Sequence, residues 1–220
     1  WRTGVGRIYD MEAGVLALQG GFREHARALC RLGANCREIR LPRHFVGLDA
    51  LVVPGGESTT IGKLAAEYDL VDPILDFCRD NKPVWGTCAG AIFLSKPTGA
   101  NRTALGLIDI EIERNAYGRQ VDSFEAEVKT TLPSVGGEES LNDEAHTSMF
   151  PGVFIRAPRV STVGSSVDVL GRISTGEIVA ARQGNLMVTM FHPELTNDCR
   201  FHEYFLEMSA DRVGRGVVDG

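Results

Sequence analysis

The chain has 220 residues, a formal net charge of −6 and a pI near 5.4. This acidic balance argues against a surface for nucleic acid or an anionic membrane. The longest uncharged stretch, residues 83–95, is too short to span a bilayer. The five cysteines form no Cys-x-x-Cys pair, so we expect no disulfide framework, no zinc site, and a reducing, cytoplasmic compartment.

The first segment, residues 1–10, contains two arginines but no apolar core of signal-peptide length. The first strand-like run begins just after Met11. We therefore expect the natural start to lie near Met11, and residues 1–10 to be a leader or a cloning remnant.

The first half alternates short apolar runs with helical patterns. Strands are predicted at 13–18, 36–41, 49–53 and 82–87, and helices at 22–33, 59–67, 70–80 and from about residue 89. This alternation is typical of βαβ units on a buried parallel sheet. Such folds place their sites at the carboxyl ends of the strands, where glycine turns follow Leu18, Val53 and Trp85.

The second half contains alternating strand patterns separated by turn signals, and we expect them to extend the same sheet as an antiparallel or mixed region. A final helix is predicted from "NDCRFHEYFLEMSADRV", capped by Asn197 or Asp198. The segment 132–150 is polar and acidic, and predicts a surface insertion. With no linker or internal repeat, residues 11–220 are expected to form a single domain. The strand patterns cover 106–114, 122–129, 152–158, 168–173, 178–185 and 186–194.

The stretch "VWGTCAGA" places Cys88 between two glycines where a strand passes into a helix. This pattern is typical of a nucleophile elbow, in which the side chain points into the cleft above the sheet. The helix N-terminus favours the thiolate, and the Ala89 N–H could bind an oxyanion. The alternative is a buried structural cysteine, the commonest state of a free cysteine. Cys30, Cys36, Cys78 and Cys199 are assigned to that buried or inert class.

The sequence "MFHPEL" contains a histidine and a carboxylate two residues apart. In an extended strand, residues i and i+2 face the same side, so Glu194 is expected to orient His192, with Pro193 holding the backbone extended. The imidazole can then activate a thiol. The other histidines are expected to be satisfied core or strand-end residues, because none is paired with an acid in such a setting; they are His25, His44, His146 and His202.

The loop "PGGEST" is a second glycine turn at a strand end. Gly55 and Gly56 could direct N–H groups toward a developing oxyanion. A phosphate-binding loop is disfavoured because no Gly-Lys-Ser/Thr follows, and a plain turn is the remaining alternative.

Seven stretches together resemble the glutaminase subunits of pyridoxal 5′-phosphate synthase, which are class I, triad-type glutamine amidotransferases. They are "VLALQGGFREH", "VVPGGEST", "PVWGTCAG", "ERNAYGRQVDSFEAE", "GVFIRAP", "VAARQGN" and "FHPELTND". The resemblance runs from about residue 13 to 208, interrupted mainly at 132–150. It implies a three-layer, flavodoxin-like α/β fold: a mostly parallel central sheet flanked by helices, with an antiparallel extension.

The resemblance also implies roles for individual residues. Cys88 would be the nucleophile, His192 the base and acid, and Glu194 its orienting group, with an oxyanion hole from Gly55, Gly56 and Ala89. L-Glutamine would be held by Gly56, Glu57, Ser58, Arg114, Ile155 and Arg156, and Gln19 would face the partner protein. An arginine is a sensible partner for the α-carboxylate of glutamine. No metal or other cofactor is implied.

The implied activity is hydrolysis of L-glutamine to glutamate and ammonia, with the ammonia delivered to a (β/α)₈ synthase subunit in a hetero-oligomer. Two alternatives remain open. The chain could be a related hydrolase, serving another synthase or acting as a γ-glutamyl peptidase. It could instead be a catalytically silent regulatory subunit, although retention of the Cys-His-Glu set argues against that.

Overall fold

The computed structural model describes residues 11–99, 102–114, 123–132 and 147–215, with side chains to residue 210. The predicted leader 1–10, residues 115–118 of the "ERNAYG" motif, His146 and most of the predicted insertion therefore lie outside the described residues.

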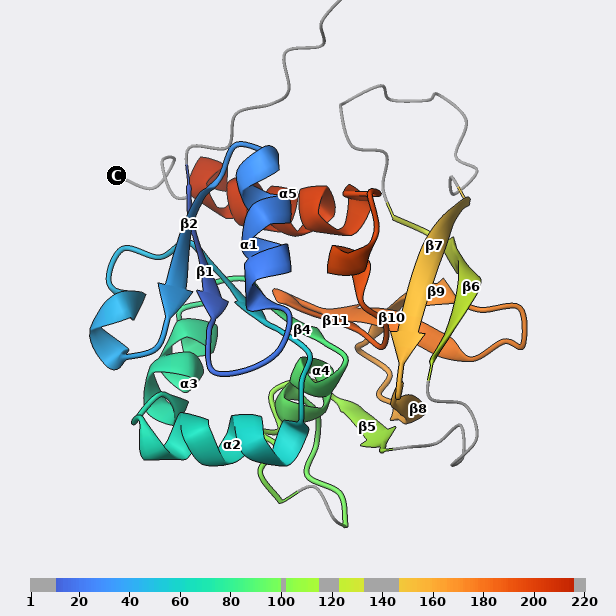
Figure 1. The fold of residues 1–220 in the computed structure, drawn as a ribbon, viewed down its shortest axis with the longest axis horizontal. Helices are drawn as coiled ribbons and strands as arrows, with labels where there is room; N and C mark the ends of the chain where they lie inside the picture. The colour runs from blue at the N-terminus through green and yellow to red at the C-terminus, as the bar shows by residue number, and fades with distance from the viewer. Residues whose placement is uncertain (1–10, 100–101, 115–122, 133–146, 216–220) are drawn as a thin grey trace, which may run out of the picture.

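A nine-stranded sheet forms the centre of the molecule (Figure 1). Its strands are β1 (Glu12–Leu16), β2 (Asn35–Ile39), β3 (Ala50–Val53), β4 (Val84–Thr87), β6 (Ser123–Thr130), β7 (Ser148–Ile155), β9 (Asp168–Arg172), β10 (Ile178–Gln183) and β11 (Leu186–Thr189). Their spatial order is β2-β1-β3-β4-β11-β10-β9-β6-β7. Along this spatial order, the neighbouring pairs β2-β1, β1-β3, β3-β4 and β4-β11 are parallel. The remaining pairs, β11-β10, β10-β9, β9-β6 and β6-β7, are antiparallel. The predicted mostly parallel sheet with an antiparallel extension is confirmed.

Helices cover both faces of this sheet, which gives the expected three layers. They are α1 (Phe22–Arg31), α2 (Ser58–Glu67), α3 (Val71–Arg79), α4 (Ala89–Leu94) and α5 (Arg200–Arg215), with short 3₁₀ turns η1 (Pro42–Phe45) and η2 (Pro193–Leu195). Figure 1 shows α1 and α5 on one side and α2, α3 and α4 on the other. Within the described residues, no helix has the length and apolar character needed to cross a membrane.

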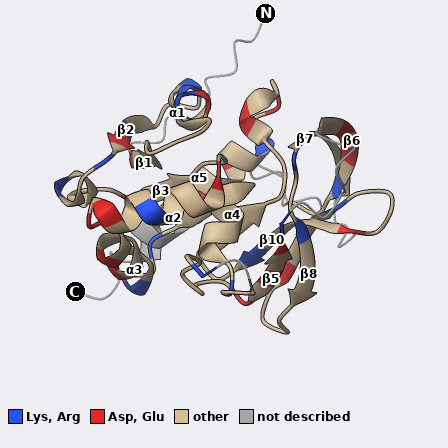
Figure 2. Ribbon diagram, turned by 60° about the horizontal axis from the view of Figure 1, so that its bottom comes forward, with Lys and Arg blue, Asp and Glu red and all other residues tan. Residues whose placement is uncertain are grey.

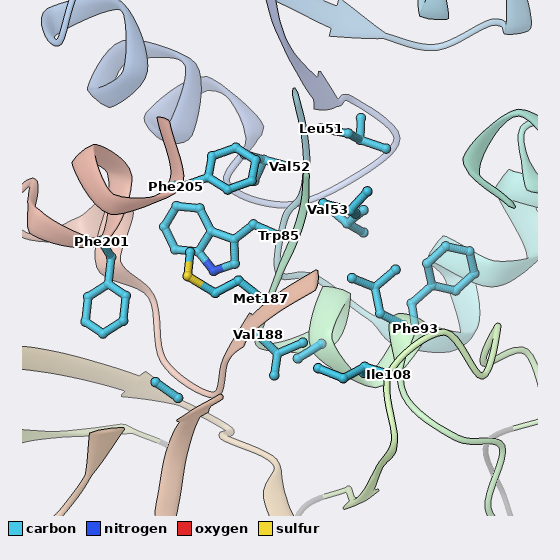
Figure 3. Packing of buried hydrophobic residues seen from close by; sticks show 14 of the residues in the cluster. Leu51, Val52, Val53, Trp85, Phe93, Ile108, Met187, Val188, Phe201 and Phe205 are labelled. Atoms are coloured by element: carbon cyan, nitrogen blue, oxygen red, sulfur yellow. The ribbon is translucent and has the colours of Figure 1, made fainter. Parts of the chain in front are cut away.

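The parallel strands read as continuous apolar runs because both of their faces are covered. Every residue of β3 and β4 is buried, as expected for strands between two helical layers. Figure 3 shows Trp85 of β4 packed among Met187, Phe205 and Val52, and the Trp85 and Phe205 ring centroids are 5.5 Å apart. This apolar packing fixes the ends of the strands, where the candidate site lies.

The short helix α4 lies directly against the sheet. It carries no charged residue (Figure 2), and all six of its residues are buried. A methyl group added at Gly90 would lie 1.9 Å from the carbonyl oxygen of Val53. Only glycine allows this close approach, which sets the position of the residue that precedes the helix.

Two of the sequence predictions for the second half are wrong. Residues 106–114 do not extend the main sheet: β5 (Ile110–Glu113) pairs with β8 (Arg159–Val163) in a separate two-stranded sheet. Strand β8 was not predicted, because its largely exposed sequence lacks a clear apolar alternation.

The predicted insertion 132–150 also extends too far. Strand β7 begins at Ser148, inside that range, and contains Pro151. Proline usually argues against a strand, but β7 is the last strand of the sheet, and an edge strand can accommodate a residue without an N–H.

Candidate active site

A cleft of about 280 Å³ opens at the carboxyl ends of β3 and β4. Its walls come from six separate loops and helix starts, as expected for an open α/β sheet. The lining residues are Gly20, Gly21, Gly55, Gly56, Glu57, Ser58, Cys88, Ala89, Ile92, Arg114, Ile155, Arg156, Pro158 and His192. The structure thus brings together in one cleft most of the residues singled out from the sequence, with Gln19 and Glu194 just behind its wall.

Cys88 lies on the turn between β4 and α4 with φ of 49° and ψ of −106°. A positive φ is uncommon for a residue with a side chain and stores strain. The turn is held by the Cys88 N–H, which donates to Thr189 O at 2.8 Å, and by the close packing of α4. Cys88 Sγ faces the cleft at 3.8 Å from Ile155 O. The thiol is therefore presented at the helix N-terminus, as in a nucleophile elbow.

The Gly55-Gly56 turn passes beside the thiol. A methyl group at Gly55 would lie 2.6 Å from His192 Cε1 and 3.3 Å from Cys88 Cβ, so a side chain there would block the cleft. The Gly55 N–H donates to Thr87 Oγ1 at 3.0 Å. Among the candidate donors, the N–H groups of Gly56 and Ala89 therefore remain to meet an oxyanion.

His192 and Glu194 form a hydrogen-bonded pair, with 2.8 Å between Nδ1 and Oε1. The predicted extended backbone is wrong: β11 ends at Thr189, and Pro193 begins the 3₁₀ turn η2, which contains Glu194. This turn brings the Glu194 carboxylate against the imidazole of His192. Strand β7 fixes the histidine, since the His192 N–H donates to Val153 O at 2.8 Å.

The electrostatics of this pair favour a charged imidazole. Burial alone lowers the pKa of His192, but hydrogen bonds and charge from Cys88 and Glu194 outweigh it and raise the pKa to about 10. Burial alone raises the pKa of Glu194, yet His25 and His192 hold it well below its usual range. The site therefore stabilises an imidazolium on His192 beside a carboxylate on Glu194.

The opposite wall is formed by the start of α2. Glu57 caps this helix by accepting the N–H groups of Thr59 and Thr60. Its burial is slight, and those hydrogen bonds lower its pKa to about 2. Arg114 reaches across from the end of β5 and donates to Glu57 Oε1 at 2.6 Å and to Thr59 Oγ1 at 2.9 Å. A fixed guanidinium thus faces the cleft, with further N–H groups for an anion.

Three further predicted residues complete the wall. Ser58 Oγ is buried and has no hydrogen-bond partner within the described residues. Ile155 is the last residue of β7, and Arg156, which follows it, has a positive φ of 43°. Gln19 supports the glycine turn from outside the cleft, because its Oε1 accepts the Glu57 N–H at 2.9 Å.

The sequence reasoning missed His25. It is fully buried on α1, which confirms the predicted core histidine, but its Nε2 lies 3.2 Å from Glu194 Oε2, a pairing that the sequence did not indicate. The distance of 169 residues between His25 and Glu194 in the chain concealed the pairing.

Comparisons with known proteins bear on this site. The profile of the SNO glutamine amidotransferase family matches residues 15–211. The pyridoxal 5′-phosphate synthase subunit PdxT of Herpetosiphon aurantiacus is 49% identical over 200 residues, covering 89% of this chain and 99% of its own length. PdxT of Dehalococcoides mccartyi is 48% identical over 204 residues, covering 91% and 98%.

A solved structure of a glutamine amidotransferase superimposes with a TM-score of 0.79 and 47% identity, covering 90% of this chain and 98% of that one. PurLQS from Thermotoga maritima, at 16% identity, has a TM-score of 0.68 and covers 93% of this chain and 99% of its own. This more distant likeness concerns the fold alone.

Proposed function

The chain belongs to the SNO glutamine amidotransferase family, and from this premise we propose that it is the glutaminase subunit of a pyridoxal 5′-phosphate synthase. It hydrolyses L-glutamine to L-glutamate and ammonia, which serves vitamin B6 synthesis. The observation that carries the proposal is the meeting of Cys88 and His192 in one cleft that also presents a fixed arginine, with Glu194 bonded to His192 from behind the cleft wall.

The Cys88 thiolate attacks Cδ of the glutamine side chain, and the carbonyl oxygen becomes an oxyanion. The N–H groups of Gly56 and Ala89 stabilise that charge. As the C–N bond breaks, His192 gives its proton to the departing nitrogen, which leaves as ammonia, and a glutamyl thioester remains on Cys88. His192 then takes a proton from water, whose oxygen attacks the thioester and releases glutamate.

The remaining residues of the cleft hold the amino acid. Arg114 pairs with the α-carboxylate, since its guanidinium is already fixed by Glu57. Ser58 Oγ, buried without a partner in the described part of the chain, supplies a hydrogen bond that the free protein does not use. The backbone at Gly56, Ile155 and Arg156 closes the pocket around the aliphatic part of glutamine.

Residues 11–220 act as one glutamine amidotransferase domain within the cytoplasm. The ammonia passes to a (β/α)₈ synthase subunit, and the two chains form a hetero-oligomer. The turn around Gln19 belongs to the face that meets this partner, because it supports the Gly55-Gly56 turn from outside.

The test measures ammonia release from glutamine by the wild-type chain and by Cys88→Ala, each mixed with a synthase subunit. Cys30→Ala is the matched control, because Cys30 is exposed and outside the cleft. We expect Cys88→Ala to lose at least about a thousandfold in kcat and Cys30→Ala to keep its activity. A silent regulatory subunit would show no glutaminase activity in the wild type.

A further inference from the structure

Two buried histidines lie behind the catalytic carboxylate. His25 of α1 is 0% exposed and His202 of α5 is 1% exposed. His25 Nδ1 is 3.0 Å from His202 Nε2, and both rings meet Trp85 edge-on. The reaction steps use neither histidine, although burying two imidazoles together is costly.

The other nitrogen of His25 faces the site. Its Nε2 lies 3.2 Å from Glu194 Oε2 and 3.2 Å from Thr87 Oγ1. The contact with Thr87 is aligned as a hydrogen bond, whereas Glu194 Oε2 is buried without an aligned donor in the described residues. The other carboxylate oxygen, Oε1, already accepts from His192. His25 is therefore the group close enough to offset the cost of burying the negative charge on Glu194 Oε2.

These contacts favour one placement of hydrogen on the His25 ring. If Nε2 had none, its lone pair would face the buried oxygen at 3.2 Å, and the carboxylate would be strongly disfavoured. With hydrogen on Nε2, Nδ1 accepts the Nε2–H of His202. Burial and the nearby His25 hold the pKa of His202 well below its usual value, so His202 is neutral and fits this arrangement.

We propose that His25 is a positioning residue for the glutaminase reaction: its Nε2–H, shared between Thr87 Oγ1 and the second oxygen of Glu194, keeps the carboxylate ionised and directed at His192. His25 acts through Glu194 and His192 on the Cys88 thiolate and touches no substrate atom. The inference rests on the proposed glutaminase function.

The charged groups around this pair fall into two sets. The buried set comprises the charged His192 and Glu194 together with two further titratable groups, Cys88 and the neutral His202. The outer set comes from α1 and borders an opening of about 600 Å³ beside η2; it comprises Glu24, Arg27 and Arg31. The Glu24 and Arg27 side chains are 38% and 75% exposed, so solvent screens their effect. The buried set, and His25 in particular, controls the state of Glu194.

Two matched variants separate positioning from packing. His25→Gln keeps an amide N–H near the Nε2 position, which faces Glu194. His25→Asn places its amide near the Nδ1 position, which faces His202. Both are assayed for glutamine kcat/KM with the synthase subunit present. Both are also assayed for the pH dependence of Cys88 alkylation by iodoacetamide, followed by mass spectrometry. His44→Gln, a histidine outside the cleft, is the control, and thermal unfolding establishes that each variant is folded.

We expect His25→Asn to lower kcat/KM by about ten- to a hundredfold, the range for one lost hydrogen bond to a charge. Without its donor, Glu194 becomes easier to protonate, the imidazolium–thiolate pair is weakened, and Cys88 becomes reactive only at higher pH. His25→Gln should keep the wild-type alkylation profile and stay within about threefold in kcat/KM. Equal behaviour of the two variants, or an alkylation profile that moves in neither, overturns the proposal.

The alkylation assay also separates this inference from the proposed function. If the wild type releases no ammonia but His25→Asn alone shifts Cys88 alkylation, the glutaminase proposal fails and the role of His25 stands. A measurement on the unaltered chain needs no variant to fold: the side-chain ¹⁵N shifts of His25 should show hydrogen on Nε2. A His25 ring protonated only at Nδ1 would contradict the proposal.

Discussion

His192 lies between two groups that both favour its charged form. Cys88 and Glu194 raise its pKa to about 10 against the opposing effect of burial. At neutral pH the imidazolium is therefore ready to protonate the leaving nitrogen. The strain at Cys88, with φ of 49°, fixes where that thiolate points.

The first prediction concerns Glu194→Gln, which keeps the shape and removes the charge. Losing an acceptor that favours the imidazolium lowers the pKa of His192, so the basic limb of the pH profile of kcat/KM moves to lower pH. We expect kcat to fall by roughly a hundredfold or more, as when the acid of a triad is neutralised. Glu203→Gln on α5, outside the cleft, is the control. An unchanged basic limb in Glu194→Gln would show that Glu194 does not set the charge of His192.

At the scale of elements, the site depends on how closely α4 approaches the sheet. Gly86 and Gly90 face each other, since a methyl group on Gly86 would lie 2.7 Å from backbone atoms of Gly90. Backbone contact of this kind leaves no room for a side chain, because backbone atoms cannot rotate away. The two glycines thus fix the elbow from both sides.

The second prediction is that Gly90→Ala destabilises the protein by roughly 1–3 kcal/mol, the usual cost of overpacking a core. It should also reduce activity, because α4 and Cys88 must move. Urea unfolding measures the first effect and ammonia release the second. Ala66→Val adds bulk at an exposed position of α2 and should cost less than about 1 kcal/mol. Equal stability of Gly90→Ala and wild type would refute the packing argument.

At the scale of the whole molecule, one sheet joins the parallel half to the antiparallel half. The β4–β11 ladder pairs Val84 with Leu186 and Thr87 with Thr189, so the two halves share their central hydrogen bonds. The cleft needs both halves: Cys88 comes from one, and His192 with Ile155 from the other. Loss of either half would therefore remove the site.

The third prediction follows from this shared sheet: residues 11–220 unfold as one cooperative unit. In a Trp1→Phe variant, Trp85 is the remaining tryptophan, and it lies in the core (Figure 3). Its fluorescence and far-UV circular dichroism should give coincident urea transitions. Two separated transitions would indicate two domains.

The fourth prediction concerns the assembly. We expect weak glutaminase activity in the isolated chain and higher activity with the synthase subunit, because Gln19 and Gly20 contact the Gly55-Gly56 turn from the side that we propose meets the partner. Gly20 approaches so closely that a methyl group there would lie 1.7 Å from Gly55 O. Ammonia release with and without the partner measures this coupling, and equal rates would contradict it.

The sequence by itself determined the order of the elements and the residues at the strand ends. Apolar runs alternating with helical patterns require a covered parallel sheet, and glycines at −2 and +2 from Cys88 leave few roles for that cysteine. Both signals are local, since neighbours along the chain impose them. Because these signals are local, β8 was missed, since its sequence lacks apolar alternation. The end of the predicted insertion was misplaced because β7, which begins inside it, contains Pro151.

Only the tertiary structure decided which distant groups meet. The turn η2 replaced the extended backbone expected between His192 and Glu194. Three contacts join segments far apart in the chain: the Gly55 N–H with Thr87, Arg114 with Glu57, and His25 with Glu194. Such contacts depend on the packing of helices against a shared sheet, which side-chain volumes and burial determine. Local sequence patterns carry no record of them, and the geometry of the site follows from them.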